Sequence, residues 1–108
     1  MTKIKAVEPT SGIDEDGRRW ETVEVSGKTY RLRSVKVNES DAAFDASQNP
    51  DKTFNPRLNQ RLLLCSSITS PATTLDDIGE WDIAKLVTLL AAYDRVNTLP
   101  AADDEGNA

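Results

Sequence analysis

The sequence of 108 residues contains no histidine and a single cysteine, Cys65. Histidine is the commonest general base, the commonest metal ligand and the usual partner of a serine or cysteine nucleophile, so its absence argues against catalysis. A lone cysteine cannot form an internal disulfide, and within the apolar run "RLLLCSSI" we expect a buried structural thiol. The sequence also lacks GxGxxG, Walker and paired CxxC motifs. We therefore expect a protein that is not an enzyme and that uses no cofactor and no metal.

Long apolar runs and an excess of positive charge are missing as well. No segment approaches the about 20 apolar residues that span a bilayer, and "MTKIKAVEPTSG" lacks the apolar segment of a signal peptide. The formal net charge is −5, and residues 74–108 hold eight Asp and Glu against two Lys and Arg. Such a chain lacks the basic footprint of a nucleic-acid-binding protein. We expect an intracellular protein that contacts neither membrane nor nucleic acid.

A β-hairpin is predicted where the runs "RRWETVEV" and "KTYRLRSV" flank Ser26-Gly27, because both runs are rich in β-branched and aromatic residues and Gly accepts positive φ. A two-residue turn places Val23, Val25, Tyr30 and Leu32 on one side of the hairpin. The implied cross-strand pairs are Val25 with Lys28, Val23 with Tyr30, Glu21 with Leu32, Thr22 with Arg31, and Trp20 with Arg33. We expect the last pair to form a cation–π contact on the surface. Upstream, "KIKAVEP" is a candidate edge strand, with "SGIDEDG" as the connecting turn.

Helices are predicted after Val37, where the hydrophobic period changes. Asn38 is the expected N-cap of a short helix over residues 39–47, and Asn55-Pro56 should begin a helix over 56–67 with Leu58, Leu62 and Cys65 on one side. "ITSPATT" reads as a loop. Thr74 with Asp77 fits a capping box at the start of the stretch 75–96, which Gly79 can divide into two helices.

Together these elements predict an α+β fold. We expect an N-terminal antiparallel β-hairpin or three-stranded meander followed by about three α-helices, as one domain over residues 1–97. Val23, Tyr30 and Leu32 should pack on Leu58, Leu62 and the last helix. Residues 98–108 are acidic and interrupted by proline, so they should form a mobile tail.

The last predicted helix is more apolar than a surface helix requires. At 100° per residue its main apolar face holds Ile83, Leu86, Val87, Leu90 and Tyr93, with Leu89 and Val96 extending that face and Lys85, Thr88 and Arg95 on the solvent side. This arc exceeds the about 100° that a monomeric surface helix needs, so part of it is expected to meet another chain. The candidate partner-binding residues, from which core and partner contacts are drawn, are Leu62, Leu63, Ile83, Leu86, Leu89, Leu90 and Tyr93. As a hypothesis, Leu90 is a core residue and Leu89 a partner contact.

Asp94 falls inside this apolar arc, where an unpaired carboxylate would be costly. Two interpretations remain open at this point. The carboxylate is either hydrated near the end of the helix, or paired with Arg57 or Arg61.

The order of these parts resembles a known family. The hairpin strand "YRLRSVKV", the helical segment ending in "RLLLCSSI" and the stretch "LDDIGEWDIAKLVTLLAAYD" are similar to the small tail assembly chaperones of long-tailed bacteriophages, over residues 20–97. The resemblance implies a protein of the host cell cytoplasm that keeps the helical tape measure protein soluble and helps tail tube subunits polymerise around it. The implied partners are the tape measure protein and the tail tube protein, with a homo-oligomer as an open alternative.

Two other functions fit the same sequence. A structural virion component, such as a head–tail connector or tail-completion subunit, would bury the same apolar surfaces permanently in a ring. A small acidic regulatory module would instead work through the carboxylates between Asp76 and Asp82.

Overall fold

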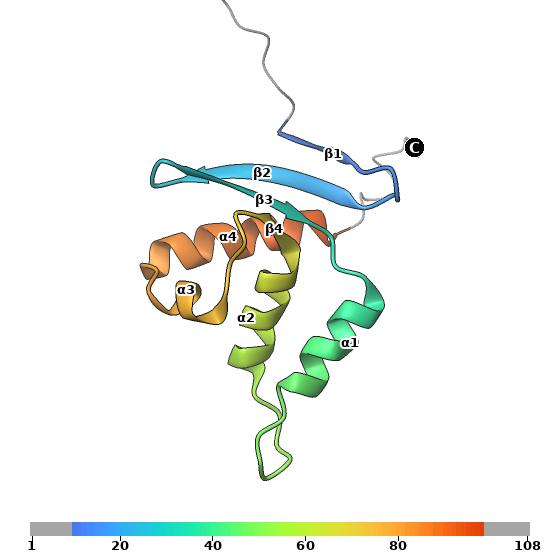
Figure 1. The fold of residues 1–108 in the computed structure, drawn as a ribbon, viewed down its shortest axis with the longest axis vertical. Helices are drawn as coiled ribbons and strands as arrows, with labels where there is room; N and C mark the ends of the chain where they lie inside the picture. The colour runs from blue at the N-terminus through green and yellow to red at the C-terminus, as the bar shows by residue number, and fades with distance from the viewer. Residues whose placement is uncertain (1–9, 99–108) are drawn as a thin grey trace, which may run out of the picture.

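The computed structural model describes residues 10–98, in which helices lie against one face of an antiparallel sheet (Figure 1). The strands are β1 (Ser11–Ile13), β2 (Arg19–Val25), β3 (Lys28–Arg33) and β4 (Ile68–Ser70), in the spatial order β1-β2-β3-β4. The helices are α1 (Val37–Ala46), α2 (Pro56–Ser67), α3 (Leu75–Gly79) and α4 (Ile83–Val96). Helix α4 lies along the sheet, α2 runs away from it, and α1 lies beside α2 (Figure 1). The predicted α+β class is therefore confirmed, with one strand more than the three-stranded meander and four helices where about three were expected.

The hairpin of β2 and β3 has the predicted register, including Val25 opposite Lys28 and Val23 opposite Tyr30. Ser26 and Gly27 have φ values of 54° and 79°, as a two-residue type I′ turn requires. Trp20 lies opposite Arg33 as predicted, but the predicted cation–π contact between these two residues was wrong.

The guanidinium carbon of Arg31, rather than that of Arg33, lies 3.9 Å from the centroid of the Trp20 ring. Arg31 is the diagonal neighbour of Trp20 across the two strands, and a long side chain reaches a ring at that position. Arg33 instead places its Nη1 4.0 Å from the Asp14 carboxylate.

The strand that precedes the hairpin lies elsewhere than predicted. The segment "KIKAVEP" falls outside the described residues, and β1 forms within the stretch that was predicted to be a turn. Gly12 pairs with Trp20, and a Cβ at position 12 would come within 2.9 Å of the Trp20 indole nitrogen. Glycine therefore lets the indole ring lie directly against the β1 backbone, an advantage that a scan for β-branched residues does not detect.

Strand β4 was predicted to be a loop. Ile68 pairs with Leu32 of β3, and the Ser67 hydroxyl donates a hydrogen bond of 2.6 Å to the Arg33 carbonyl oxygen. Only three residues separate the end of α2 from Pro71, so no alternating pattern is long enough to be seen in the sequence. Ile68 is nevertheless buried in the core.

The helix boundaries follow mostly from their capping residues. Asn55 accepts a hydrogen bond from the Leu58 backbone N–H, and α2 spans the predicted residues. Thr74 and Asp77 form the predicted capping box, and α3 ends at Gly79.

The predicted cap of α1, Asn38, was wrong. The helix begins at Val37 after the N-cap Lys36, whose backbone N–H donates to the Glu39 carboxylate at 2.9 Å. A second donor, the Arg18 guanidinium, lies 2.8 Å from the same carboxylate. Glu39 thus caps the start of α1 and ties it to Arg18, the residue directly before β2.

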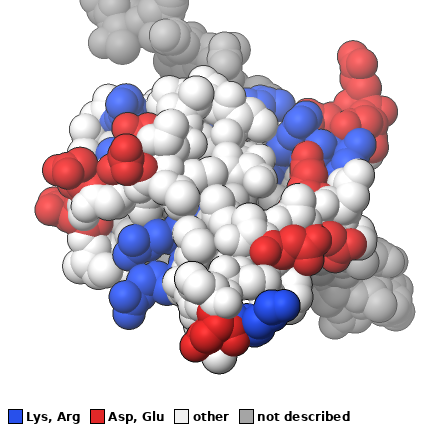
Figure 2. Space-filling model, turned by 60° about the horizontal axis from the view of Figure 1, so that its bottom comes forward, with Lys and Arg blue, Asp and Glu red and all other residues white. Residues whose placement is uncertain are grey.

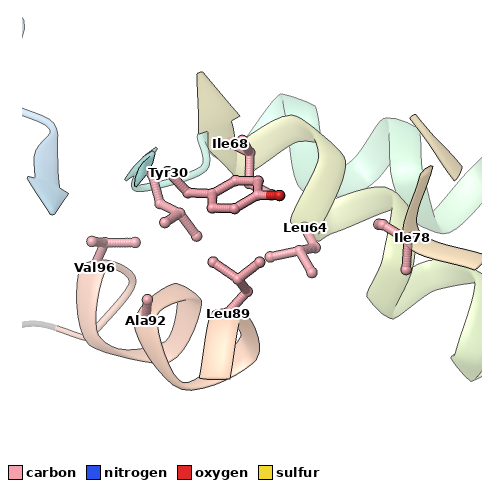
Figure 3. Packing of buried hydrophobic residues seen from close by; sticks show 8 residues of the cluster. Tyr30, Leu64, Ile68, Ile78, Leu89, Ala92 and Val96 are labelled. Atoms are coloured by element: carbon pink, nitrogen blue, oxygen red, sulfur yellow. The ribbon is translucent and has the colours of Figure 1, made fainter. Parts of the chain in front are cut away.

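The core forms where α4 and α2 meet the sheet, and Figure 3 shows the side chains of α4 pointing toward Tyr30 and Ile68. Its buried members are Tyr30, Leu32, Leu64, Ile68, Ile78, Leu89, Ala92 and Val96. Val23 and Val25 pack against this cluster, so the hairpin lies on the last helix as predicted. On α2 the fully buried leucine is Leu64, whereas the predicted core residues Leu58 and Leu62 are only half-buried.

The hypothesis for α4 had its two leucines reversed. Leu89 is 0% exposed, so it is a core residue and not a partner contact, whereas Leu90 is half-buried. The buried side of α4 is centred on Leu89, Ala92 and Val96, roughly a third of a turn away from the predicted face. The small Ala92 side chain allows the helix to approach the sheet closely, a feature that the distribution of large apolar residues does not report.

Substitution of Leu89 by alanine is expected to lower the free energy of unfolding by about 2–5 kcal/mol, because it leaves a cavity in the core. Ile83→Ala on the same helix should change it by less than about 0.5 kcal/mol, since Ile83 is 73% exposed. Urea denaturation of both variants tests the two values. Equal losses would contradict the assignment of the buried face.

Substitution of Glu39 by glutamine is expected to lower stability in a pH-dependent way. The Lys36 backbone N–H and the Arg18 guanidinium lower the pKa of Glu39 in the folded chain. A carboxyl whose pKa is lowered on folding stabilises the fold above its unfolded pKa, and this contribution disappears as the pH falls through the folded pKa. Denaturation at several pH values should show the Glu39→Gln deficit shrinking toward acid. Asp41→Asn, a change of an exposed carboxylate on the same helix that takes part in none of the described salt bridges, is the matched control.

Candidate partner-binding surface

The α4 stripe, defined as Ile83, Leu86, Val87, Leu90 and Tyr93, runs along the border between the buried and the exposed sides of α4. Ile83 and Val87 are one helical turn apart and are 73% and 59% exposed. The other three side chains are half-buried and pack against the edge of the core. Single exposed apolar residues are common on protein surfaces, but a row that continues from the core into solvent is typical of an interaction site.

The uncharged surface is broad on the side that the helices form. Figure 2 shows a white area across the middle of that side, with separate groups of charged residues around it. At the far end of the stripe, burial and the Asp94 carboxylate raise the pKa of Tyr93, so its hydroxyl remains a hydrogen-bond donor at neutral pH. The stripe can therefore offer apolar contact to a partner at Ile83 and Val87.

The structure separates the predicted partner-binding residues into three places. Ile83, Leu86, Leu90 and Tyr93 lie on the α4 stripe, and Leu89 lies in the core. Leu62 and Leu63 are half-buried on α2, so they are not part of the α4 stripe.

Val87 was missing from the predicted partner-binding residues, although it is among the most exposed apolar side chains of the described chain. Its spacing of four residues from Ile83 was the signal that could have found it.

A shallow groove separates α1 from α2. It has a volume of about 380 Å³, and its lining includes Ala42, Ala43, Ala46, Leu62 and Cys65. Cys65 is half-buried rather than buried as expected, and burial followed by the charge of Asp77 raises the pKa of its thiol. The thiol is therefore protonated at neutral pH, which agrees with an unreactive structural role.

Charge is distributed unequally around α4. The Lys85 ammonium lies 4.9 Å from the ring centroids of both Tyr30 and Trp81, and Lys85 is half-buried rather than on the predicted solvent side. Arg95 points toward the sheet, where its Nε donates to the Glu21 carboxylate at 2.9 Å. Both cations of α4 are therefore held by the chain itself.

Asp94 is exposed at the end of α4, so the interpretation of a hydrated carboxylate holds. The alternative, an ion pair with Arg57 or Arg61, is not found: within residues 10–98 neither arginine forms a salt bridge. The carboxylate continues the direction of the α4 stripe, seven residues after Val87.

The double substitution Ile83→Ser and Val87→Ser is expected to remove apolar surface without unfolding the chain. Both side chains are largely exposed, so each change should alter the free energy of unfolding by less than about 0.5 kcal/mol. Binding of a hydrophobic dye, measured beside thermal unfolding, should decrease while the unfolding temperature stays near that of the parent. A large loss of stability would show that these residues serve the core.

Comparisons of the chain with protein-family models, with curated proteins and with solved structures yield no match in any of the three.

Proposed function

We propose that this chain is a tail assembly chaperone of a long-tailed bacteriophage, which works in the host cell cytoplasm without catalysing a reaction. In this role it binds the helical tape measure protein and assists polymerisation of the tail tube. The observation that carries the proposal is the α4 stripe, with Ile83 and Val87 exposed one turn apart. The similarity of residues 20–97 to that family in the order and pattern of their elements supplies the identity of the partner.

An exposed apolar helix face suits a helical partner. Amphipathic helices commonly bind by laying their apolar side chains along a hydrophobic surface, with contacts repeated every three to four residues. The α4 stripe offers contacts at that spacing, from Ile83 through Leu86 and Val87 to Leu90. A long helical protein that has not yet assembled exposes such apolar rows along its length and would aggregate through them.

The strength of the contact suits a temporary complex. Full burial of a Val or Ile side chain contributes about 1.5–3 kcal/mol, so covering the exposed parts of Ile83 and Val87 would contribute about 2–4 kcal/mol in total. A micromolar complex needs about 8 kcal/mol, so these two residues alone cannot hold a partner permanently. The net charge of −5 would help to keep the complex in solution.

Co-expression tests the proposal. The tagged chain is produced together with the longest helix-rich protein encoded just downstream in its own genome, and the soluble, co-purified partner is measured against the partner expressed alone. We expect the partner to become soluble with the parent chain and to precipitate with the Ile83→Ser, Val87→Ser variant. Val37→Ser, which changes an apolar side chain that is 78% exposed on α1, should retain the effect.

Two results would contradict the proposal. One is a partner that is equally soluble without the chain. The other is equal rescue by the double serine variant, which would remove the α4 stripe from the interaction. Recovery of the chain from purified virus particles would instead favour a structural virion component.

A further inference from the structure

We propose that the helix bound by the α4 stripe carries lysine or arginine at both ends of its own apolar row. This inference rests on the proposed function and specifies the chemistry of the segment that the chain recognises. It is drawn from the charges that surround the stripe.

Carboxylates bracket the α4 stripe. Asp82 directly precedes Ile83, and Asp94 follows Leu90 by four residues and Val87 by seven, which places it in line with them. Both aspartates are exposed. The salt bridges of the described chain use Asp14, Glu21 and Glu39, so within residues 10–98 neither Asp82 nor Asp94 has a cationic partner.

The two cations of α4 cannot neutralise these carboxylates without leaving their present contacts, and Arg19, beside the end of the helix, donates to the Thr98 carbonyl oxygen. Lys85 lies over the Tyr30 and Trp81 rings, and Arg95 is bound to Glu21 of β2. Both contacts hold the charged ends of these side chains on the sheet side of α4. The outward side of the helix therefore presents apolar side chains between two negative ends.

A partner helix that covers the stripe must place a suitable side chain opposite Asp94. Because Asp94 continues the line of Val87 and Leu90, a helix that covers the whole stripe also covers this carboxylate. Removing a carboxylate from water is costly unless a cation or hydrogen-bond donor replaces the water. A partner with lysine or arginine at that point satisfies Asp94, whereas a partner with glutamate adds repulsion.

The two aspartates also define a spacing. Twelve residues at a rise of 1.5 Å separate Asp82 from Asp94 by about 18 Å along the helix axis. A partner helix lying along α4 would thus need cations about three turns apart. Because both ends of the stripe are acidic, a parallel or an antiparallel helix meets the requirement equally well.

Two fluorescently labelled helical peptides of equal length and identical leucine rows test the inference with the full chain. One carries lysine at two positions eleven residues apart, about three turns along the same face as the row, and the other carries glutamate there. At low salt we expect the lysine peptide to bind five- to tenfold more tightly, on the order of what two surface ion pairs supply. Fluorescence anisotropy should show this preference decreasing as salt is added.

Matched variants identify the responsible carboxylates. Asp82→Asn with Asp94→Asn should remove the preference for lysine, whereas Asp41→Asn with Asp45→Asn makes the same charge change on exposed residues of α1 and should retain it. Loss of preference in both double variants would mean that net charge alone is responsible and would overturn the inference.

The remaining outcomes separate the inference from the proposed function. Equal binding of both peptides to the parent, lost in the Ile83→Ser, Val87→Ser variant, would overturn the inference while retaining helix binding by the stripe. No binding of either peptide would also contradict the inference, and the co-expression result would then decide the proposed function independently.

Discussion

The packing of Leu89, Ala92 and Val96 against the hairpin is the contact on which the rest of the fold depends. These residues hold α4 against the face of the sheet that carries Tyr30 and Leu32, and Leu64 of α2 enters the same cluster. Burial of this row fixes the rotation of α4 about its axis. The rotation in turn decides which apolar residues of the helix are left outside, so the core determines the composition of the α4 stripe.

The electrostatic arrangement follows from the same rotation. With Leu89 and Ala92 inward, Arg95 reaches Glu21 on β2 and Lys85 reaches the Tyr30 and Trp81 rings, so both cations stabilise the domain. Asp82 and Asp94 remain exposed beside Ile83 and Val87. An apolar row between negative ends is a poor surface for self-association, because a second copy would bring carboxylates of the same sign together in either orientation. It suits a partner of opposite charge.

Local chemistry explains which parts of the fold could be predicted from the sequence. The hairpin register followed from Ser26-Gly27, since a two-residue turn leaves one pairing, and α2 followed from Asn55-Pro56. Strands β1 and β4 have three residues each, too few to show a period, and depend on tertiary contacts such as Ile68 in the core.

The candidate surface was predicted only in part for a related reason. Hydrophobic periodicity located the apolar arc on the last helix but could not say which portion faces the sheet. The large apolar residues determine where periodicity places the apolar face. The buried face of α4 is instead centred where the small Ala92 side chain permits close approach to the sheet. Periodicity alone therefore assigns Leu89 to the partner surface and leaves Val87 out of it.

Photo-crosslinking tests whether the α4 stripe is the surface that holds a partner helix. A photoreactive amino acid is placed at Val87 in one sample and at Val37 in another, and each chain is produced together with the helix-rich partner. We expect a crosslink to the partner from position 87 and none from position 37. A crosslink from position 37 alone, or none from either position in a complex that co-purifies, would contradict this expectation.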